Sequence, residues 1–464
     1  TPDRLDPPLR ASDAYSALRI ELECRPGVDF SQLDLSSLRF YINDTGNVAH
    51  GLYELLLNNC TEVVVRHPEP KFRGSTLTLP GSSVAPVGFQ PDQALIPYPR
   101  RSLQSYRLLQ EYFAFPEKFL FFDLNGLGPV RWSGFKDKLQ LVFLISRYER
   151  ADRHELLESG VSARTLRLAC TPVVNLFPHN AEPIQLNHAK FEYPITADSR
   201  RAEGLEIFSI EEVVRTSDAT RETERLERLL SFRPGTRAQD QTFWQSSRAP
   251  RQDASGADDL ILTLVDASGR TLRCDLDTLT IRCLCTNGDL PSKLPFGNES
   301  GDFTCQTGGA IDRIWALRNP TPTVRPTLGG VTLWKLVSHL SLNYLSLVED
   351  GREALQEMLR LYQDSSQSSL QQQVDGIVAI QNTRGFARVA SDHGITYVRG
   401  TKIGLTLDED RFVGGGVYLF ASILERFFAQ YAALNSFTQL AVSTRQRKEV
   451  LREWQPRSGE RILL

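Results

Sequence analysis

The sequence predicts an α+β protein of several domains, with β-rich lobes followed by a C-terminal α+β domain of the split-βαβ kind. Three observations support this prediction. The chain has 464 residues, enough for two to four domains of ordinary size. Strand-like alternation of apolar and polar residues dominates residues 18–145 and 259–318. From residue 331 onward, helical stripes and strands follow one another in the order α-β-β-α-β.

The first β-rich domain is expected over residues 18–149, after a linker of residues 1–17. Residues 18–24 alternate apolar and polar side chains without error, as in a half-buried strand. Further strands are expected at 38–42, 62–65, 118–124 and 139–145. Helices are expected at 47–58 and 105–116, the second ended by Pro116. The Pro- and Gly-rich residues 66–100 predict long turns.

Residues 150–258 are interpreted as a connecting region that contains a strand at 208–214. Its last part, residues 216–258, is polar and predicts a mobile excursion or a domain boundary. Residues 259–330 predict a second β-rich lobe. In that lobe Asp266–Gly269 would form a hairpin turn between strands 260–265 and 271–276, and residues 279–285 alternate again.

The C-terminal α+β domain is expected over residues 331–464. Residues 333–347 are predicted to be helical or partly extended, and the apolar spacing predicts helices around 355–362 and over 417–434. Strands are expected at 374–380, 386–389, 396–407 and 438–442. We expect this domain, which contains the 417–434 helix, to hold an assembly surface, and charge substitutions on the polar face of that helix would test this expectation.

Composition and charge exclude several classes of protein. With 53 basic and 56 acidic residues, the chain lacks the strong positive field of a general nucleic-acid binder. It has no run of 18 apolar residues that would span a membrane. Seven scattered cysteines, an odd number, argue against a secreted disulfide framework and favour a reducing cytoplasm. The first residue is Thr1, and the linker-like start suggests a piece of a longer gene product.

Candidate metal sites are weak. Cys283 and Cys285, with Cys274, lack the two-residue spacing of a zinc knuckle and would share one face of a strand, where buried thiols act as small hydrophobes. His154 begins half of a zinc-protease motif, but Glu158 stands where the second histidine is required. We therefore predict no metal, cofactor or catalytic set.

Two features of the C-terminal domain invite a functional interpretation. Gly414–Gly416 precedes a helix like a phosphate cradle, but no Lys-Ser/Thr follows and Asp408–Asp410 would repel a phosphate, so close packing or a special turn is favoured. Asp408–Asp410 itself is interpreted as a solvated acidic turn. A hydrolase that uses these carboxylates stays open as an alternative of another class, and raised pKa values in a deep pocket would support it.

Three long blocks of the sequence stand out together. The first block is Leu108–Phe119 with Asp123–Leu127, the second is Val174–Ile184 with Glu192–Pro194, and the third runs from Tyr397 to Leu440. In this order the blocks resemble the TssF (ImpG/VasA) family, the wedge subunits of the type VI secretion baseplate. The residues that these blocks mark as core or interface candidates are Leu108, Tyr112, Phe113, Phe115, Pro116, Glu117, Phe119, Asp123, Phe177, Glu182, Pro183, Arg399, Gly400, Asp408, Gly414, Gly416, Phe427, Phe428, Tyr431, Asn435 and Phe437.

The resemblance implies a structural, non-enzymatic role without cofactors. It implies that two copies assemble with one TssG, joined by TssE and TssK, around the VgrG spike hub, where they support assembly of the Hcp tube and the sheath. It also implies a cytoplasmic protein, docked at the inner face of the cytoplasmic membrane through the secretion complex without inserting. A wedge protein of a phage tail or of another contractile injection particle is the alternative within this class.

Overall fold

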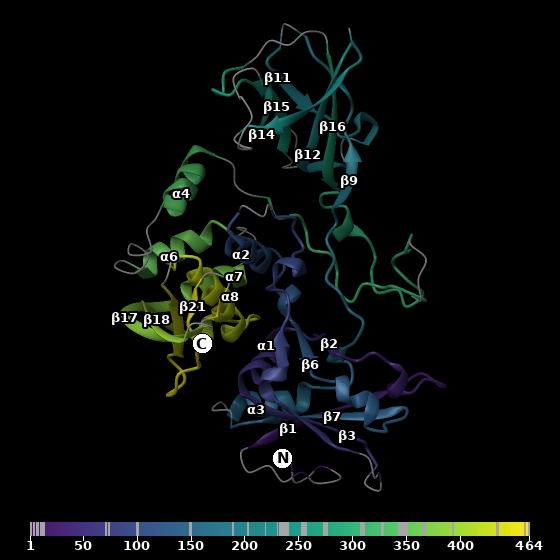
Figure 1. Ribbon diagram of the computed structural model, residues 1–464, viewed down its shortest axis with the longest axis vertical. Helices are drawn as coiled ribbons and strands as arrows, with labels where there is room; N and C mark the ends of the chain where they lie inside the picture. The colour runs from purple at the N-terminus through teal and green to yellow at the C-terminus, as the bar shows by residue number, and fades with distance from the viewer. Residues whose placement is uncertain are drawn as a thin grey trace. The chain divides into compact units, whose positions relative to one another are not determined.

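The computed structural model describes most of the chain, and the chain folds into two compact units. The first unit comprises Thr1–Pro172 and Trp334–Leu464, and the second comprises Val173–Leu333. Figure 1 labels their elements. The described residues are 14–69, 75–98, 102–147, 151–187, 190–201, 204–218, 220–229, 241–251, 258–271, 277–306, 311–325, 329–341, 351–363, 368–391, 394–432, 436–458 and 461–462, with residues 2, 5, 9, 72 and 231.

The N-terminal part of the first unit contains two four-stranded antiparallel sheets. One has the order β1-β7-β3-β4 and the other β5-β6-β2-β8. Phe122 stacks on Phe40 within the second sheet, and its ring meets the edge of Phe143 from the first, so aromatic side chains join the two sheets. The strands are β1 (Ser16–Glu23), β2 (Ser37–Ile42), β3 (Cys60–Arg66), β4 (Leu77–Pro80), β5 (Val84–Pro86), β6 (Phe121–Asn125), β7 (Lys138–Ile145) and β8 (Leu166–Arg167).

The helices expected in this part are confirmed. They are α1 (Gly46–Glu54), which continues as a π-helical segment over Leu55–Asn59, and α2 (Gln104–Ala114); α3 (Ala151–Gly160) is additional. Two expectations are corrected. The turn-rich residues 66–100 also contain the short strands β4 and β5. The strand predicted at 118–124 begins only at Phe121, because Pro116–Phe119 form a 3-10 turn after the helix.

The C-terminal part of the first unit forms a sheet of order β17-β18-β19-β21-β22, with β20 paired to β19. β18 and β19 are parallel and are connected through α8, which confirms the expected βαβ arrangement. The elements are α4 (Gly330–Ser341), α6 (Gly351–Arg360), α7 (Ser368–Asp375), β17 (Ile377–Ser391), β18 (Gly394–Leu407), α8 (Val417–Ala429), β19 (Thr438–Thr444), β20 (Arg452–Glu453), β21 (Arg457–Ser458) and β22 (Arg461–Ile462).

The two strands predicted at 374–380 and 386–389 are one strand. Val374 ends α7, and β17 then runs without a break from Ile377 to Ser391. Gly385, which lies between the two predicted strands, pairs in register with Gly400 of β18. Helix α8 ends at Ala429, so the predicted extension of this helix is wrong for residues 430–432, while residues 433 and 434 lie outside the described residues. Residues 342–347 of the first predicted helix also lie outside them.

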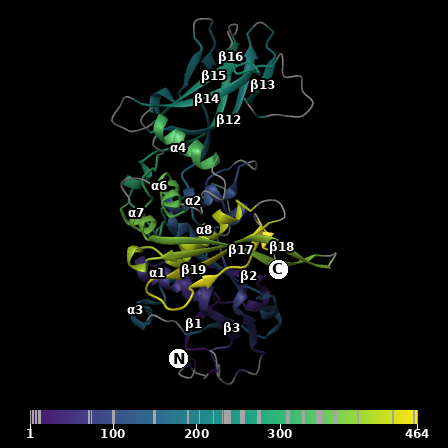
Figure 2. The same cartoon turned by 90° about the vertical axis from the view of Figure 1, so that its left-hand side faces the viewer.

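Helix α8 lies at the centre of the first unit. Every residue of α8 except Arg426 is buried. The helix contacts α2 and α1 on the N-terminal side and β19 of its own sheet, so it joins segments from both ends of the chain (Figure 2). Tyr112 of α2 packs against Phe420 of α8 and donates a hydrogen bond of 2.7 Å to Gln373 Oε1 of α7. The two ends of the sequence therefore share one hydrophobic core.

A buried set of charges connects the same segments. Arg447 donates to Glu54 Oε1 of α1 at 2.5 Å and, through Nε, to Glu409 Oε1 at 2.5 Å. The three side chains are only 6%, 3% and 0% exposed. Thr444 donates a further hydrogen bond of 2.8 Å to Glu409. Such charges are tolerated in an interior only because they compensate one another.

The second unit contains an eight-stranded sheet of order β10-β16-β12-β13-β14-β15-β11, with β9 also paired to β16. Its strands are β9 (Phe177–Asn180), β10 (Ile184–Gln185), β11 (Glu192–Ile195), β12 (Glu206–Ser217), β13 (Thr223–Arg228), β14 (Phe243–Pro250), β15 (Asp258–Val265) and β16 (Asp277–Thr286). Cys283 and Cys285 lie in its core beside Ile281, as predicted. Burial raises the pKa of the Cys283 thiol to about 12 and that of Cys285 to about 11.

The polar stretch 216–258 is not a simple excursion, because β13 and β14 belong to this sheet. Each of these strands has one buried hydrophobic side chain, Leu226 and Trp244, and the indole donates to the Leu226 carbonyl at 3.2 Å. The remaining side chains are largely polar, so the composition resembles that of a loop. The turn at Asp266–Gly269 is confirmed by hydrogen bonds within it, whereas residues 272–276 lie outside the described residues.

The two units are not consecutive stretches of the chain, because the first unit combines an N-terminal and a C-terminal segment. Segments 18–149 and 331–464 fall almost entirely in the first unit, and segment 259–330 falls in the second. The four boundaries between the five segments expected from the sequence stay predictions. Within the described residues, no helix has the length and apolar character needed to cross a membrane.

Replacing Arg447 with Met should destabilise the first unit by about 3–5 kcal/mol, because Glu54 and Glu409 would remain buried without their cation. Urea unfolding of the purified protein, followed by circular dichroism, measures this loss. Arg445→Met is the matched control, because the Arg445 side chain is 60% exposed and should contribute less than about 1 kcal/mol. Equal unfolding midpoints for the two variants would contradict the assignment.

Candidate assembly surfaces

The first family-like block forms a buried charge cluster around α2. Arg107, Glu111 and Lys118 are all about 0–1% exposed at their side chains. Arg107 Nη1 lies 2.9 Å from Glu111 Oε2, and the Lys118 ammonium contacts the same carboxylate oxygen. The three charges therefore share one acceptor in the interior.

This cluster fixes the segment that precedes α2. Glu111 Oε1 accepts hydrogen bonds from the backbone N–H groups of Leu95 and Ile96, at 2.8 and 3.1 Å. Arg107 Nη2 donates to the carbonyls of Phe89 and Gln90, at 3.4 and 3.3 Å. The block thus anchors an irregular segment whose backbone groups would otherwise lack partners.

Half of the block's candidate residues are core residues. Leu108, Tyr112, Phe113 and Phe119 are buried, whereas Phe115, Pro116 and Glu117 are half-buried. Asp123 of β6 forms two 2.8 Å bonds with Arg39 on the neighbouring strand.

Sequence reasoning missed Arg107, Glu111 and Lys118. The available signal was a pair of opposite charges spaced i, i+4 within a stripe of buried side chains.

The second block lies in the second unit. Phe177 of β9 packs against its core. Glu182 is exposed, and its Oε1 accepts from the Ser199 backbone N–H at 2.7 Å, a contact that lowers the pKa of the carboxyl. Pro183 is also exposed. This block therefore orders a loop at the edge of the sheet.

The glycines of the third block allow close packing, as expected. A Cβ on Gly416 would lie 2.8–2.9 Å from the ring of His50 in α1, and a Cβ on Gly400 would collide with Phe437. Gly414 has a φ of +75°, which other residues rarely adopt. These positions let α8 and β18 approach their neighbours without a clash.

The remaining candidates of the third block lie around α8. Phe427, Phe428 and Phe437 are buried. Tyr431 is half-buried, with its hydroxyl 3.1 Å from that of Tyr106. Asn435 lies outside the described residues.

The acidic turn differs from its expected solvated form. Glu409 is buried in the charge set with Arg447, and Asp408 accepts a 2.6 Å hydrogen bond from Gln446. That hydrogen bond lowers the pKa of Asp408. A hydrolase would need carboxylates with raised pKa values that converge in a pocket, and this turn provides structural ion pairs and caps instead.

The polar face expected on the 417–434 helix is wrong for its described part, Val417–Ala429, whereas an assembly surface elsewhere in the C-terminal domain stays a prediction. This helix has almost no polar face, because only Arg426 is partly exposed. The apolar stripe in the sequence predicted one buried face, but the polar residues Ser422 and Glu425 are buried as well. A hydrogen bond of Ser422 and an ion pair of Glu425 compensate for their burial. An assembly surface must be sought elsewhere.

The β17–β18 ribbon provides such a surface. The register pairs Phe386 with Arg399 and Arg388 with Tyr397, so these four side chains share one face. Phe386 is 70% exposed and Tyr397 is 72% exposed. Arg384 is exposed on the same face. We call Arg384, Phe386, Arg388, Tyr397 and Arg399 the aromatic–arginine face.

The composition of this face is typical of protein–protein contacts. Aromatic and arginine side chains are the residues most often responsible for binding energy at interfaces. The described residues of the ribbon, 377–391 and 394–407, contain no Asp or Glu. Figure 2 shows the ribbon extending beyond its neighbouring strands. Of the candidates read from the sequence, Arg399 alone lies on this face.

The comparisons with known proteins point in one direction. A family model described as "Type VI secretion system, TssF" matches residues 1–461. The type VI secretion system component TssF1 of Pseudomonas aeruginosa PAO1 is 34% identical over 469 residues, which cover 98% of this chain and 74% of the relative.

Two solved structures are also similar. A chain of the TssK–TssF–TssG baseplate subcomplex, determined by cryo-electron microscopy, matches with a TM-score of 0.72 and 25% identity, over 97% of this chain and 80% of that chain. A chain of the type VI secretion baseplate complex matches more weakly, with a TM-score of 0.46 and 24% identity, over 77% and 60% of the two chains.

The buried charge cluster predicts a pH dependence. Burial lowers the pKa of Lys118 to about 8 from its ordinary 10.5, so between these values the unfolded chain binds more protons than the folded one. The contribution of Lys118 to stability should therefore rise by roughly 1–3 kcal/mol as the pH increases through this window.

Urea midpoints of the wild type and of Lys118→Met, measured from pH 7 to 10.5, isolate this effect, because the other titrating groups are common to both proteins. The urea midpoint of the wild type should increase relative to that of the variant as the pH rises. A constant difference over the window would argue against the lowered pKa.

Proposed function

The chain belongs to the TssF family of type VI secretion system components, and we propose that two copies of it join one TssG-like subunit to form a wedge of the baseplate. The family membership confirms the resemblance that the three sequence blocks indicated. The protein is accordingly a structural baseplate component and not an enzyme. The observation that carries the wedge proposal is the likeness, over 97% of this chain, to a chain of a baseplate subcomplex whose other members are TssK and TssG.

The first unit suits a scaffold because its core includes both ends of the sequence. Segments more than 390 residues apart, such as Glu54 and Arg447, meet in its interior. A unit built in this way keeps its surfaces in fixed positions. Several weak contacts on such surfaces can together give a high affinity, because the first contact raises the effective concentration for the others.

We assign the aromatic–arginine face to contact with an acidic surface of a TssG-like or TssK-like partner. Its three arginines favour a partner with carboxylates at matching positions. Antiparallel pairing of two copies along the edge strand β17, centred on Phe386, would place Arg384 opposite Arg388, and like charges in that position are destabilising. A second copy would therefore use another surface.

The wider assembly follows from the same proposal. TssE joins the wedge, and six wedges surround the VgrG hub and support the Hcp tube and the sheath. We place the protein in the cytoplasm, docked on the membrane complex without inserting. A wedge protein of a phage tail or another contractile particle would be built by the same principles, and the identity of the partner that binds distinguishes the two.

Co-expression with the TssG-like and TssK-like subunits of the same organism tests the proposed function. The expected result is a stable complex with two copies of this chain per TssG-like subunit, determined by native mass spectrometry. Failure to form the complex would overturn the proposal, and a one-to-one complex would overturn the copy number.

Arg388→Glu should weaken binding to the partners about tenfold, because the glutamate would be repelled by the acidic surface that the arginine attracts. Phe386→Ala should weaken it by a similar factor. Lys402→Glu is the matched control, because Lys402 lies on the opposite face of the ribbon, 3.8 Å from Glu453. Biolayer interferometry measures the affinities, and equal effects of Arg388→Glu and Lys402→Glu would contradict the assigned face.

A further inference from the structure

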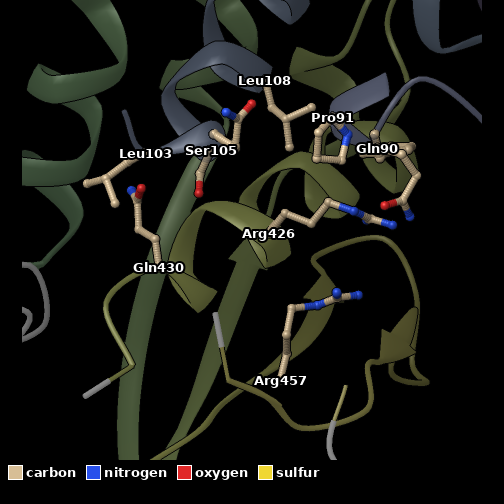
Figure 3. A pocket seen from close by; sticks show the side chains of 10 residues that line it. Gln90, Pro91, Leu103, Ser105, Leu108, Arg426, Gln430 and Arg457 are labelled. Atoms are coloured by element: carbon tan, nitrogen blue, oxygen red, sulfur yellow. The ribbon is translucent and has the colours of Figure 1, made fainter. Parts of the chain in front are cut away.

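A small cavity lies within the first unit, beside the charge cluster of α2 (Figure 3). Its volume is about 210 Å³. The segment before α2, the start of α2, the end of α8 and the strand β21 contribute its walls. The lining residues are Phe89, Gln90, Pro91, Leu103, Gln104, Ser105, Leu108, Arg426, Gln430 and Arg457.

The positive charge at this cavity is poorly compensated at Arg426. Glu425 accepts a short bond of 2.6 Å from Arg457 Nε, whereas its contact with Arg426 Nη1 is 3.4 Å long. The other hydrogen bond of Arg426 also uses Nη1 and goes to the Ser422 carbonyl at 3.2 Å. Within the described part of the chain, Nε and Nη2 of Arg426 therefore have no acceptor.

The guanidinium of Arg426 is nevertheless held in a defined position. Its Cζ lies 3.9 Å from the centre of the Phe89 ring. A contact with a ring uses the face of the planar guanidinium and leaves its edge available for an acceptor in the same plane. Burial also lowers the pKa of Arg426, which indicates that the charge gains too little from its present surroundings to offset the loss of water.

A second polar group at the cavity is poorly satisfied. Neither the oxygen nor the nitrogen of the Gln430 side-chain amide makes a hydrogen bond of ordinary geometry among the described residues, although both atoms are buried and the amide acts weakly on the Tyr431 hydroxyl. Figure 3 shows Gln430 and Ser105 at one side of the cavity and the guanidinium groups of Arg426 and Arg457 at the other. Buried amides are normally satisfied, so this group calls for an explanation.

We propose that this cavity binds a carboxylate, with the edge of Arg426 as the main donor and the Gln430 amide as a further polar contact. A planar monoanion matches the fork of a guanidinium and supplies one negative charge. A phosphate dianion would place excess charge near Glu425. The volume is below that of ordinary ligand sites, which fits an acidic side chain or a small carboxylic acid and excludes a nucleotide.

Titration of the purified protein with acetate at constant ionic strength tests the proposal, with binding followed by saturation-transfer NMR on the methyl signal. The wild type should bind acetate saturably. Arg426→Lys should weaken binding about tenfold, because it keeps the charge and removes the fork. Gln430→Leu should weaken it several-fold without unfolding the protein, since the amide makes no hydrogen bond of ordinary geometry that would be lost.

Matched controls are the same substitutions at exposed positions, Arg411→Lys and Gln110→Leu, which should leave acetate binding unchanged. Circular dichroism checks that each variant is folded. The proposal is overturned if the wild type shows no saturable binding, if neither Arg426→Lys nor Gln430→Leu weakens it, or if inorganic phosphate binds more tightly than acetate and competes with it.

The source of the carboxylate is decided by a second arm, which rests on the proposed function. Acetate is titrated into the complex with the TssG-like and TssK-like subunits. Exclusion of acetate from the complex assigns the site to an acidic side chain of a partner, and unchanged binding assigns it to a free small acid. If no complex forms, the proposed function fails, while the acetate result with the isolated protein stands by itself.

Discussion

The burial of opposite charges between the two ends of the sequence is the interaction on which the first unit depends. Glu54, Glu409 and Arg447 lie almost entirely out of water and are held by short bonds to one another. Buried ions of this kind contribute little net stability as a set, but the loss of one member leaves the others uncompensated. The charge set therefore adds little net stability. It instead specifies one packing arrangement of α1 against the C-terminal sheet, because any other arrangement would leave a buried charge without its partner. Helix α8 then fills the space between them with apolar side chains.

This arrangement explains where recognition can and cannot occur. The residues of α2 and α8, which belong to the family-like blocks, are mostly buried in the core, so these helices do not offer large contact surfaces. The exposed aromatic and arginine side chains are found on the β17–β18 ribbon, whose face is fixed by its register with its sheet. A rigid core with a projecting ribbon loses little conformational freedom on binding, which favours assembly into a larger structure. At the Arg426 cavity, polar groups in the interior face a space large enough for part of another molecule.

Local features of this fold were predictable from the sequence, and long-range ones were not. Alternation located β1, a run of apolar residues located β7, and apolar stripes at helical spacing located α2 and α8. β13 and β14 were missed because each buries a single large hydrophobic side chain and otherwise looks polar. The charge set of Glu54, Glu409 and Arg447 was missed for a different reason. Glu54 and Arg447 are far apart in the sequence, and a charged residue in an apolar stripe gives no sign of its distant partner. The resemblance to the TssF family supplied the function, which local patterns alone did not.

Native-state hydrogen exchange on the variant Glu54→Ala tests most directly whether both ends of the sequence form one cooperative unit. The account predicts that the amides of α2, from the N-terminal part, and of α8, from the C-terminal part, lose the same amount of protection. Amides in the second unit, such as those of β16, should keep theirs. Loss of protection in α1 and α2 alone, with α8 unchanged, would contradict the account, because it would mean that the two parts unfold independently and that the buried charges do not join them.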